Sequence, residues 1–322
     1  MPDSTITEKT RGFITIATGE EKYYRFAVNL LMSYRLYCPN PMPFAIMCDQ
    51  ENAYTAEFDQ AVLFRKSEHP YFDKFELLKL APYDETIFID ADCLAYGDLN
   101  EFWAYFAGGG GGDFTAAGMN FPIDDKGGLF QRDEIGQYRD RVFWKPSIHG
   151  GLYFIRKGTQ CDAIYKDCQN IANHYDAYRW PDYCAPYADE PVLCLAMAAN
   201  GCRALDADPR NYGIPWEVTE MDCDILTGKC SYATEWHPRI EHGRMIHWSV
   251  RYCGKPLYRF EVEKLNLMLK HHSRPPHGSE GFTLWEKLLY VCKLRLYGMR
   301  AWELMTRIVR KLVRILTRKD NR

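Results

Sequence analysis

The chain has 322 residues, of which 47% are hydrophobic and 26% are charged. This is the composition of a globular protein, and it excludes disordered, collagen-like and coiled-coil chains. The length is sufficient for one large or two small domains, and no apolar run approaches the ~20 residues that span a bilayer. The 12 cysteines are scattered without a CxxC pair, and the first residues are polar. We therefore expect a reduced, cytoplasmic protein with neither a zinc site nor a secretion signal.

The net charge of −3 conceals a strong asymmetry along the chain. Residues 281–322 contain eleven Lys/Arg against three acidic residues, so the preceding body carries a net −11 and this tail +8. A basic tail on an acidic body indicates an anionic partner for the tail.

The first part of the chain alternates between strand and helix patterns. Apolar β-rich runs and helical spacing predict strands at 12–17, 43–48, 61–66 and 86–89, with helices at 22–37 and 74–81. This β-α-β-β-α-β order predicts an α/β fold with a mostly parallel sheet covered by helices.

The middle of the chain is less regular. Five consecutive glycines at 108–112 lack the spacing of a phosphate-binding loop, and they predict a flexible connection. Residues 120–146 show no clear period, so we expect a long surface insertion of functional importance. Further patterns predict strands at 114–118, 152–155 and 245–246 and a helix at 190–200.

Two carboxylates, Asp90 and Asp92, follow directly after the strongest predicted strand. Ligands of open α/β sheets bind at the carboxyl ends of strands. Two acids close together there repel each other unless a cation lies between them, and Mg²⁺ or Mn²⁺ with phosphate oxygens suits such a pair. The same DxD pattern also occurs by chance in surface turns.

Five segments, in order, resemble the motifs of glycosyltransferase family 8. They are Ala17-Thr18-Gly19, the stretch from Asp73 to Asp92, Gly150–Ile155, Asp189–Leu193, and His247 with the later Gly254-Lys255-Pro256. The family includes glycogenin and bacterial lipopolysaccharide galactosyl- and glucosyltransferases. The resemblance implies a GT-A fold and retaining transfer of a hexose from a UDP-sugar with Mn²⁺ (or Mg²⁺) as cofactor.

The resemblance also assigns roles to individual residues. It implies metal binding by Asp90, Asp92 and His247, and binding of the donor by Ala17, Thr18, Lys74, Asp90, Gly254 and Lys255. The same resemblance gives the catalytic positions as Asp189 and Glu190, with Asp189 contacting a donor-sugar hydroxyl. Taken alone, His247 also fits a packed or capping histidine, and Glu190 a helix-capping acid.

Three departures from the family pattern bear on mechanism. His149 stands where asparagine is usual, Glu190 stands where glutamine is usual, and His247 and Lys255 are two positions further apart than usual. A glutamate can act as a nucleophile in a double displacement, whereas glutamine cannot do so readily. Front-face transfer, in which the departing diphosphate takes the acceptor proton, remains the other route.

The tail has the pattern of an amphipathic helix. Over residues 301–316 the aliphatic side chains share one face and the basic side chains the other, which is typical of a helix at a membrane surface. The alternative is that this helix packs onto the catalytic domain. We expect a glycosyltransferase domain at 11–265, a linker at 266–281 and a basic tail at 282–320.

The expected activity is hexose transfer to a saccharide, on a lipid-linked glycan such as a lipopolysaccharide or capsule precursor, at the cytoplasmic face of a membrane. No nucleic-acid partner is expected, because the body is acidic and contains no reading motif. Two alternatives stay open: a non-catalytic binding protein of the same fold, and a sugar nucleotidyltransferase. The turn Thr18-Gly19-Glu20-Glu21 lacks the Gly-rich basic loop that the latter needs.

Overall fold

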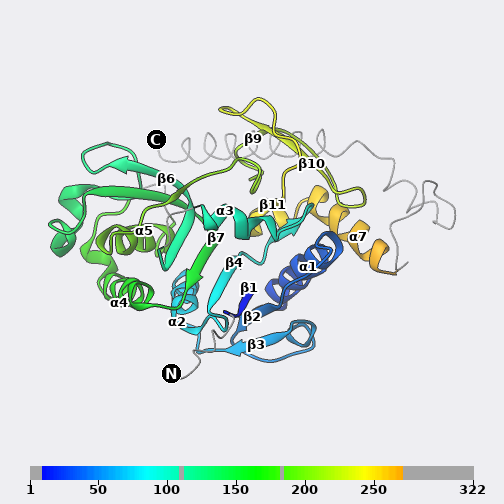
Figure 1. The fold of residues 1–322 in the computed structure, drawn as a ribbon, viewed down its shortest axis with the longest axis horizontal. Helices are drawn as coiled ribbons and strands as arrows, with labels where there is room; N and C mark the ends of the chain where they lie inside the picture. The colour runs from blue at the N-terminus through cyan, green and yellow to red at the C-terminus, as the bar shows by residue number, and fades with distance from the viewer. Residues whose placement is uncertain (1–8, 109–111, 182–184, 271–322) are drawn as a thin grey trace, which may run out of the picture.

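The computed structural model describes residues 9–108, 112–181 and 185–270, and its centre is a seven-stranded sheet (Figure 1). The strand order is β3-β2-β1-β4-β7-β6-β8. The strands are β1 (Arg11–Ala17), β2 (Phe44–Cys48), β3 (Gln60–Leu63), β4 (Glu85–Ile89), β6 (Phe114–Pro122), β7 (Trp144–Arg156) and β8 (Leu205–Asp206). Only β7 runs antiparallel to its neighbours β4 and β6; the other pairs are parallel. The expected α/β class with a mostly parallel sheet is confirmed.

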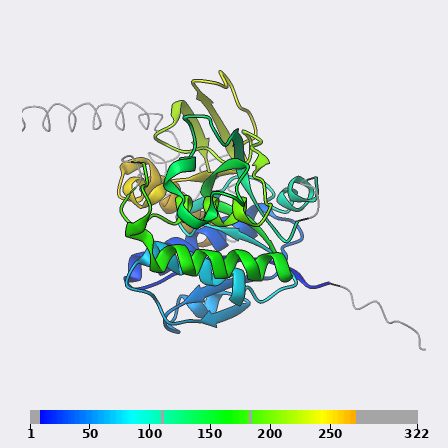
Figure 2. The ribbon, with the colours of Figure 1, turned by 90° about the vertical axis from the view of Figure 1, so that its left-hand side faces the viewer.

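Helices cover both faces of this sheet, as Figures 1 and 2 show. Alternate residues of a strand point to opposite faces, and Phe13 and Ile14 of β1 accordingly enter two different buried clusters. One face is covered by α1 (Glu21–Tyr37) and α3 (Glu101–Ala107), the other by α2 (Leu77–Leu80), α4 (Thr159–Asn173) and α5 (Asp189–Ala199). Burial of each such side chain stabilises the fold by about 1.5–3 kcal/mol.

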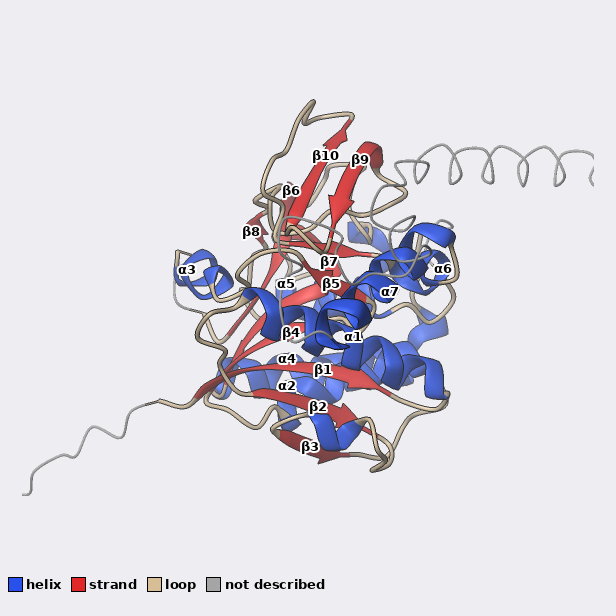
Figure 3. Ribbon diagram, turned by 90° about the vertical axis from the view of Figure 1, so that its right-hand side faces the viewer, coloured by secondary structure: helices blue, strands red, loops and turns tan. Residues whose placement is uncertain are grey.

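A smaller unit packs beside the sheet and contains the last described elements (Figure 3). The short strand β5 (Cys93–Ala95) pairs antiparallel with β11 (Met245–His247), and β9 (Val218–Asp224) forms a hairpin with β10 (Lys229–Thr234). Two helices follow, α6 (Ser249–Cys253) and α7 (Pro256–Lys270). α7 lies against α1, where the ring centroids of Phe26 and Tyr258 are 5.8 Å apart.

Short 3-10 helices occur in the connections: η1 (Thr55–Glu57), η2 (Pro70–Glu76), η3 (Arg132–Glu134), η4 (Gly136–Tyr138) and η5 (Tyr175–Ala177). The predicted helix at 74–81 is therefore the end of η2 followed by α2. The sequence patterns missed α4 and the β9–β10 hairpin.

The prediction of a surface insertion at 120–146 is wrong. Several of its apolar side chains lie in the cluster under α4 and α5, although Phe143 is exposed: Phe130 and Ile135 are fully buried, and Tyr138 and Val142 nearly so. The segment has no helical or strand period because η3, η4 and the loops around them supply these side chains at irregular intervals.

Several predictions lie outside the described residues. They concern the glycines at 109–111, residues 271–281 of the expected linker, and the basic tail at 282–320, with the membrane contact assigned to it. The first expected linker residues, 266–270, belong to α7. Among the described helices, none combines the length and apolarity needed to cross a membrane.

A buried ion network holds α7 to the hairpin and provides a test of the fold. Lys264 Nζ lies 2.8 Å from Asp224 Oδ1 and 3.0 Å from Glu261 Oε1, and Glu261 Oε2 accepts a hydrogen bond from the Ile225 amide at 2.7 Å. Lys264 and Glu261 are fully buried.

Because removing one partner leaves a buried charge uncompensated, we expect Lys264→Met to lower the free energy of unfolding by about 3 kcal/mol. The matched control is Lys229→Met, which breaks a solvent-exposed pair with Asp222 and should cost at most about 1 kcal/mol. Chemical denaturation of both variants measures the difference. Equal losses would contradict a stabilising role of the buried network.

Candidate active site

The predicted metal residues meet at the end of β4. After Ile89 the chain turns, and the Asp90 amide donates to the Gly151 carbonyl of β7 at 3.1 Å. The chain then enters β5, whose first residue Cys93 pairs with His247 of β11. This antiparallel register brings a histidine 157 positions away in sequence beside Asp90 and Asp92.

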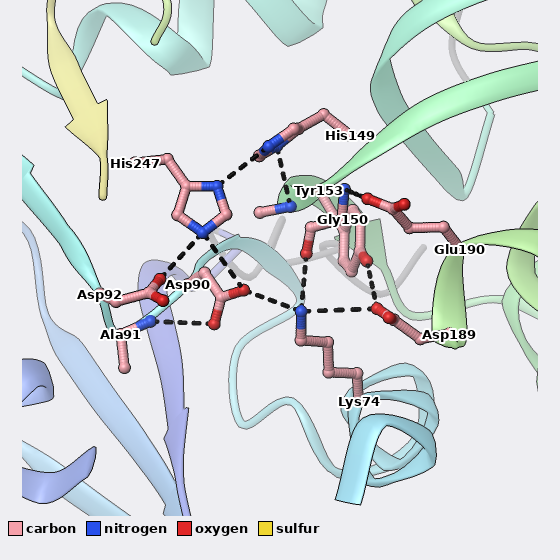
Figure 4. A network of polar contacts seen from close by, with 11 residues as sticks. Lys74, Asp90, Ala91, Asp92, His149, Gly150, Tyr153, Asp189, Glu190 and His247 are labelled. Carbon is pink, nitrogen blue, oxygen red and sulfur yellow. Dashed lines mark hydrogen bonds and ion pairs between the residues drawn. The ribbon is translucent and has the colours of Figure 1, made fainter. Parts of the chain in front are cut away.

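One nitrogen of His247 faces both carboxylates (Figure 4). Its Nε2 atom is 2.9 Å from Asp92 Oδ1 and 3.8 Å from Asp90 Oδ2. Burial opposes the charged form of His247, but the negative charges of Asp92 and then Asp90 raise its pKa above the usual value. The structure therefore brings the three predicted metal residues together.

The donor set fits a divalent cation. Asp92 Oδ1 is buried, and among the described residues no hydrogen bond of acceptable geometry reaches it. Candidate ligand atoms of Asp92, Cys93 and His247 all lie within 4.8 Å of one another, and the three residues are buried. A buried carboxylate oxygen 2.9 Å from an imidazole nitrogen places two hard ligand atoms side by side, which suits Mn²⁺ or Mg²⁺, and Cys93 adds a softer alternative ligand.

The ammonium group of Lys74 lies among the carboxylates of the site. Its Nζ donates to Asp90 Oδ2 at 2.8 Å and to the Gly150 carbonyl at 3.0 Å, and it lies 3.4 Å from Asp189 Oδ2. Burial opposes its charge, but Asp189 and Asp90 raise its pKa, so Lys74 is protonated at neutral pH. The same lysine lowers the pKa of Asp90, whose charged form burial alone would disfavour.

Asp189 and Glu190 begin α5, where the helix dipole favours acidic side chains. Asp189 Oδ2 accepts a hydrogen bond from the Tyr153 hydroxyl at 3.3 Å. Glu190 Oε1 accepts one from the Gly150 amide at 2.6 Å. Burial and the charge of Asp189 nevertheless raise the pKa of Glu190 to about 7.

Two glycines of β7 lie between the carboxylates of Asp189 and Glu190 on one side and two histidine rings on the other. A Cβ atom on Gly150 would lie 2.9 Å from Glu190 Oε1, and one on Gly151 would lie 2.9 Å from His149 Cε1 and 3.1 Å from His247 Nδ1. A methyl group at either position would therefore force a neighbouring side chain to shift, because the strand backbone itself lies between the two groups.

The predicted uridine-side residues lie at the end of β1. Ala17 is the buried last residue of this strand, and half-buried Thr18 follows it. The Gly19 amide, with φ at +75°, donates to the carboxylate of Asp49 at 3.2 Å, and the Tyr24 hydroxyl donates to the same group. The turn is therefore held by an acid directly after β2.

Gly254 and Lys255 occupy the turn between α6 and α7, where the Lys255 amide donates to the Tyr252 carbonyl at 2.8 Å. Gly254 is exposed and Lys255 is half-buried. Their role in binding a diphosphate stays a prediction.

Sequence reasoning missed the positions of three residues: Asp49 on the β1 turn, Cys93 beside the metal residues, and His149 in contact with His247 at 3.0 Å. Asp49 follows an apolar strand just as Asp90 does, so the same pattern was available to find it. His149 gave no local signal, because its partner is 98 positions away.

The wall formed by Gly151 gives a second prediction. Gly151→Ala should lower the free energy of unfolding by about 1–3 kcal/mol, because the new methyl group collides with both histidine rings. Gly108→Ala is the control, since among the described residues a Cβ there meets only the Tyr105 carbonyl, at an ordinary 3.4 Å; it should change stability by less than about 0.5 kcal/mol. Thermal or chemical unfolding measures both. A Gly151→Ala protein as stable as the control would show that the histidines can move aside.

Comparison with known proteins gives structural neighbours only. No family model matches the chain, and neither does any curated protein, so the resemblance to family 8 stays a prediction. Among solved structures, the galactosyltransferase LgtC in complex with donor and acceptor sugar analogues is 13% identical, with a TM-score of 0.49, covering 81% of this chain and 95% of that chain. An active-site mutant of LgtC is 14% identical, with a TM-score of 0.48, covering 81% of this chain and 95% of that chain. The bifunctional glycosyltransferase WbbM in its apo form is 11% identical, with a TM-score of 0.47, covering 88% of this chain and 52% of that chain. At these values the similarity says nothing about which residues act.

Proposed function

We propose that this chain is a retaining, divalent-metal-dependent glycosyltransferase that moves a hexose from a UDP-sugar to a saccharide hydroxyl. The observation that carries the proposal is the pairing of two half-sites at the carboxyl end of β4. One contains Asp92 and His247, and the other contains Lys74 with Asp189. Asp90 belongs to both, because Lys74 and His247 approach the same oxygen.

The first half-site suits a metal-bound diphosphate. Asp92 and His247 would hold the ion, with Asp90 or Cys93 as a further ligand. The ion, when bound, supplies a Lewis acid that neutralises charge on the departing diphosphate. Lys74 adds a fixed positive charge on the other side of Asp90, and a buried cation stabilises developing phosphate charge strongly.

The second half-site suits the sugar. Asp189 is held by Lys74 and Tyr153, so its carboxylate is fixed in position to accept a hydrogen bond from a donor-sugar hydroxyl. Glu190 lies next to it, with one oxygen on the Gly150 amide.

Two routes lead to retention of configuration. In front-face transfer the bond between the anomeric carbon and the diphosphate oxygen breaks, the acceptor oxygen bonds to the same face, and its proton passes to the departing oxygen. In double displacement the Glu190 carboxylate would attack the anomeric carbon as its bond to the diphosphate oxygen breaks, and the acceptor oxygen would then displace Glu190 and lose its proton to the departed diphosphate. The front-face route is the one we propose, for two reasons. Glu190 is held by a backbone amide, and with a pKa of about 7 its carboxyl group is protonated in about half of the molecules near pH 7.

The acceptor part of the proposal rests on the sequence of the tail. The basic amphipathic pattern at 301–316 favours a lipid-linked glycan at an anionic membrane surface. The donor site and the acceptor can be tested separately, because many transferases hydrolyse their donor slowly with water as acceptor.

The test of the donor site is hydrolysis of a panel of UDP-sugars with and without Mn²⁺. We expect metal-dependent turnover of one donor, lowered at least about a hundredfold in Asp92→Asn, because that change removes a ligand charge beside His247. Asp133→Asn is the control, since Asp133 is exposed and forms an ion pair with Arg139 at the surface. If no donor is turned over and calorimetry detects no Mn²⁺-dependent UDP binding, the proposed function is wrong.

A second pair of variants separates the two routes. Glu190→Gln keeps an oxygen for the Gly150 amide, so front-face transfer should stay within about tenfold of wild type. Asp189→Asn weakens the pairing with Lys74 and the hold on the sugar, and should lose about a hundredfold.

The measured quantity is kcat at saturating donor across pH 5.5 to 8.5. A nucleophilic Glu190 would give the opposite pattern: a loss of about ten-thousandfold in the glutamine variant, and a wild-type rate that rises as pH passes about 7, where Glu190 ionises.

A further inference from the structure

An exposed tryptophan lies beside His247 of the candidate site. Trp216 is 48% exposed, and the centroid of its indole ring lies 6.4 Å from that of the His247 ring, with the two planes at 68°. The indole also stacks on Tyr252, with centroids 6.0 Å apart and an interplanar angle of 29°. Because Tyr252 is buried, the indole rests on a fixed support and leaves its remaining surface open to solvent.

The backbone fixes the place of this tryptophan. Gly213 lies parallel to β11, and its carbonyl accepts a hydrogen bond from the His247 amide at 2.9 Å. A turn follows directly, in which the Glu217 amide donates to the Ile214 carbonyl at 2.9 Å. Trp216 lies within this turn, so the strand pairing that places His247 also places the tryptophan.

Exposure alone does not mark a tryptophan as functional, because single apolar side chains are common on protein surfaces. Trp236, for example, is 76% exposed in the loop after β10. Trp216 differs because its ring is held between a buried aromatic support and a residue of the candidate site. A rigid apolar surface next to a few convergent polar groups is typical of a ligand-binding site.

The chemistry of an indole face suits a sugar ring. A pyranose presents C–H groups on its faces and hydroxyl groups around its edge, and the C–H hydrogens carry a slight positive charge. The face of an aromatic ring is negative, so it attracts these hydrogens while apolar surface is buried. The hydroxyl groups stay at the rim, where water or polar side chains can bind them.

The position favours the acceptor over the donor. In the proposed function the donor sugar is held by Asp189, whereas Trp216 lies against His247 in the other half-site. A nucleobase can also stack on an aromatic ring. The proposed uridine position, however, is the turn at Thr18 after β1. The remaining ring that the reaction has to bind is that of the acceptor.

We propose that Trp216 is an acceptor-binding residue, and that a pyranose ring of the saccharide acceptor stacks on its open surface beside the diphosphate. This inference rests on the proposed function and deepens it, because it gives the acceptor a place on the described part of the chain. Loss of an aromatic partner weakens such a contact by about two- to tenfold.

Two substitutions at this position separate the aromatic face from apolar bulk. Trp216→Leu keeps an apolar side chain but removes the ring, and Trp216→Phe restores a smaller ring. The matched control is Trp236→Leu, the same change at a more exposed tryptophan.

The measurement is the Kd of the methyl glycosides of glucose, galactose and N-acetylglucosamine, by saturation-transfer NMR, with and without UDP and Mn²⁺. We expect wild type to bind at least one of them, with a Kd raised about five- to tenfold in Trp216→Leu and less than about threefold in Trp216→Phe and in the control. A Trp216→Leu protein that binds as well as the control would overturn the proposal, and so would a wild type that binds none of these sugars in either condition.

Fluorine NMR of protein labelled with 5-fluorotryptophan reports the contact itself. The chain has eight tryptophans, and the signal of Trp216 is the one missing from the Trp216→Phe variant. We expect the bound sugar to shift this signal and to leave that of Trp236 in place. If calorimetry finds that Trp216→Leu loses UDP affinity as strongly as sugar affinity, the ring belongs to the nucleobase and the proposal is overturned.

These readouts separate failure of the inference from failure of the proposed function. If UDP-sugars are hydrolysed with Mn²⁺ but sugar binding does not depend on Trp216, only the inference is wrong. If sugars bind through Trp216 but UDP neither binds nor is released from any donor, the stacking site stands and the proposed function is wrong.

Discussion

The site depends on one buried ammonium group. Lys74 reaches from η2 to Asp90 after β4, to Asp189 at the start of α5 and to the Gly150 carbonyl of β7. These segments come from separate parts of the sequence. The two carboxylates would repel each other strongly here, because the site is largely shielded from water. The ammonium of Lys74 makes their approach possible, so the geometry of both proposed half-sites depends on it.

The second constraint is the antiparallel strand β7. By pairing with β4 in this direction, it places Gly150 and Gly151 directly beside the carboxyl end of β4. Because neither residue has a side chain, the backbone can offer a carbonyl to Lys74 and an amide to Glu190 while the histidine pair packs on its other side. A parallel neighbour would instead bring the carboxyl end of its own strand here, with different groups exposed.

Local patterns were sufficient for the part of the site that follows a strand or begins a helix. An apolar run ending in Asp90-Ala91-Asp92 predicts carboxylates at a sheet edge, and Asp189-Glu190 before an apolar helix predicts acids at its dipole. The contact between His149 and His247 could not be predicted from the sequence, because it depends on the registers of two strand pairs, β7 with β4 and β11 with β5. The burial of Phe130 and Ile135 was missed for a related reason: both lie in the loops around two 3-10 helices, which are too short to show a period in the sequence.

Asp90 links the two half-sites electrostatically. Its Oδ2 atom lies 2.8 Å from Lys74 Nζ and 3.8 Å from His247 Nε2, so a cation bound beside His247, as we propose, would compete with the Lys74 ammonium for the same negative charge. Positive charge beside His247 would weaken the hold of Asp90 on Lys74, and Lys74 would then interact more strongly with Asp189 or with a phosphate. Coupling of this kind requires no movement of the backbone, because the three groups are already in contact. It also explains why a lysine, with its compact charge and three donors, suits this position better than an arginine fork would.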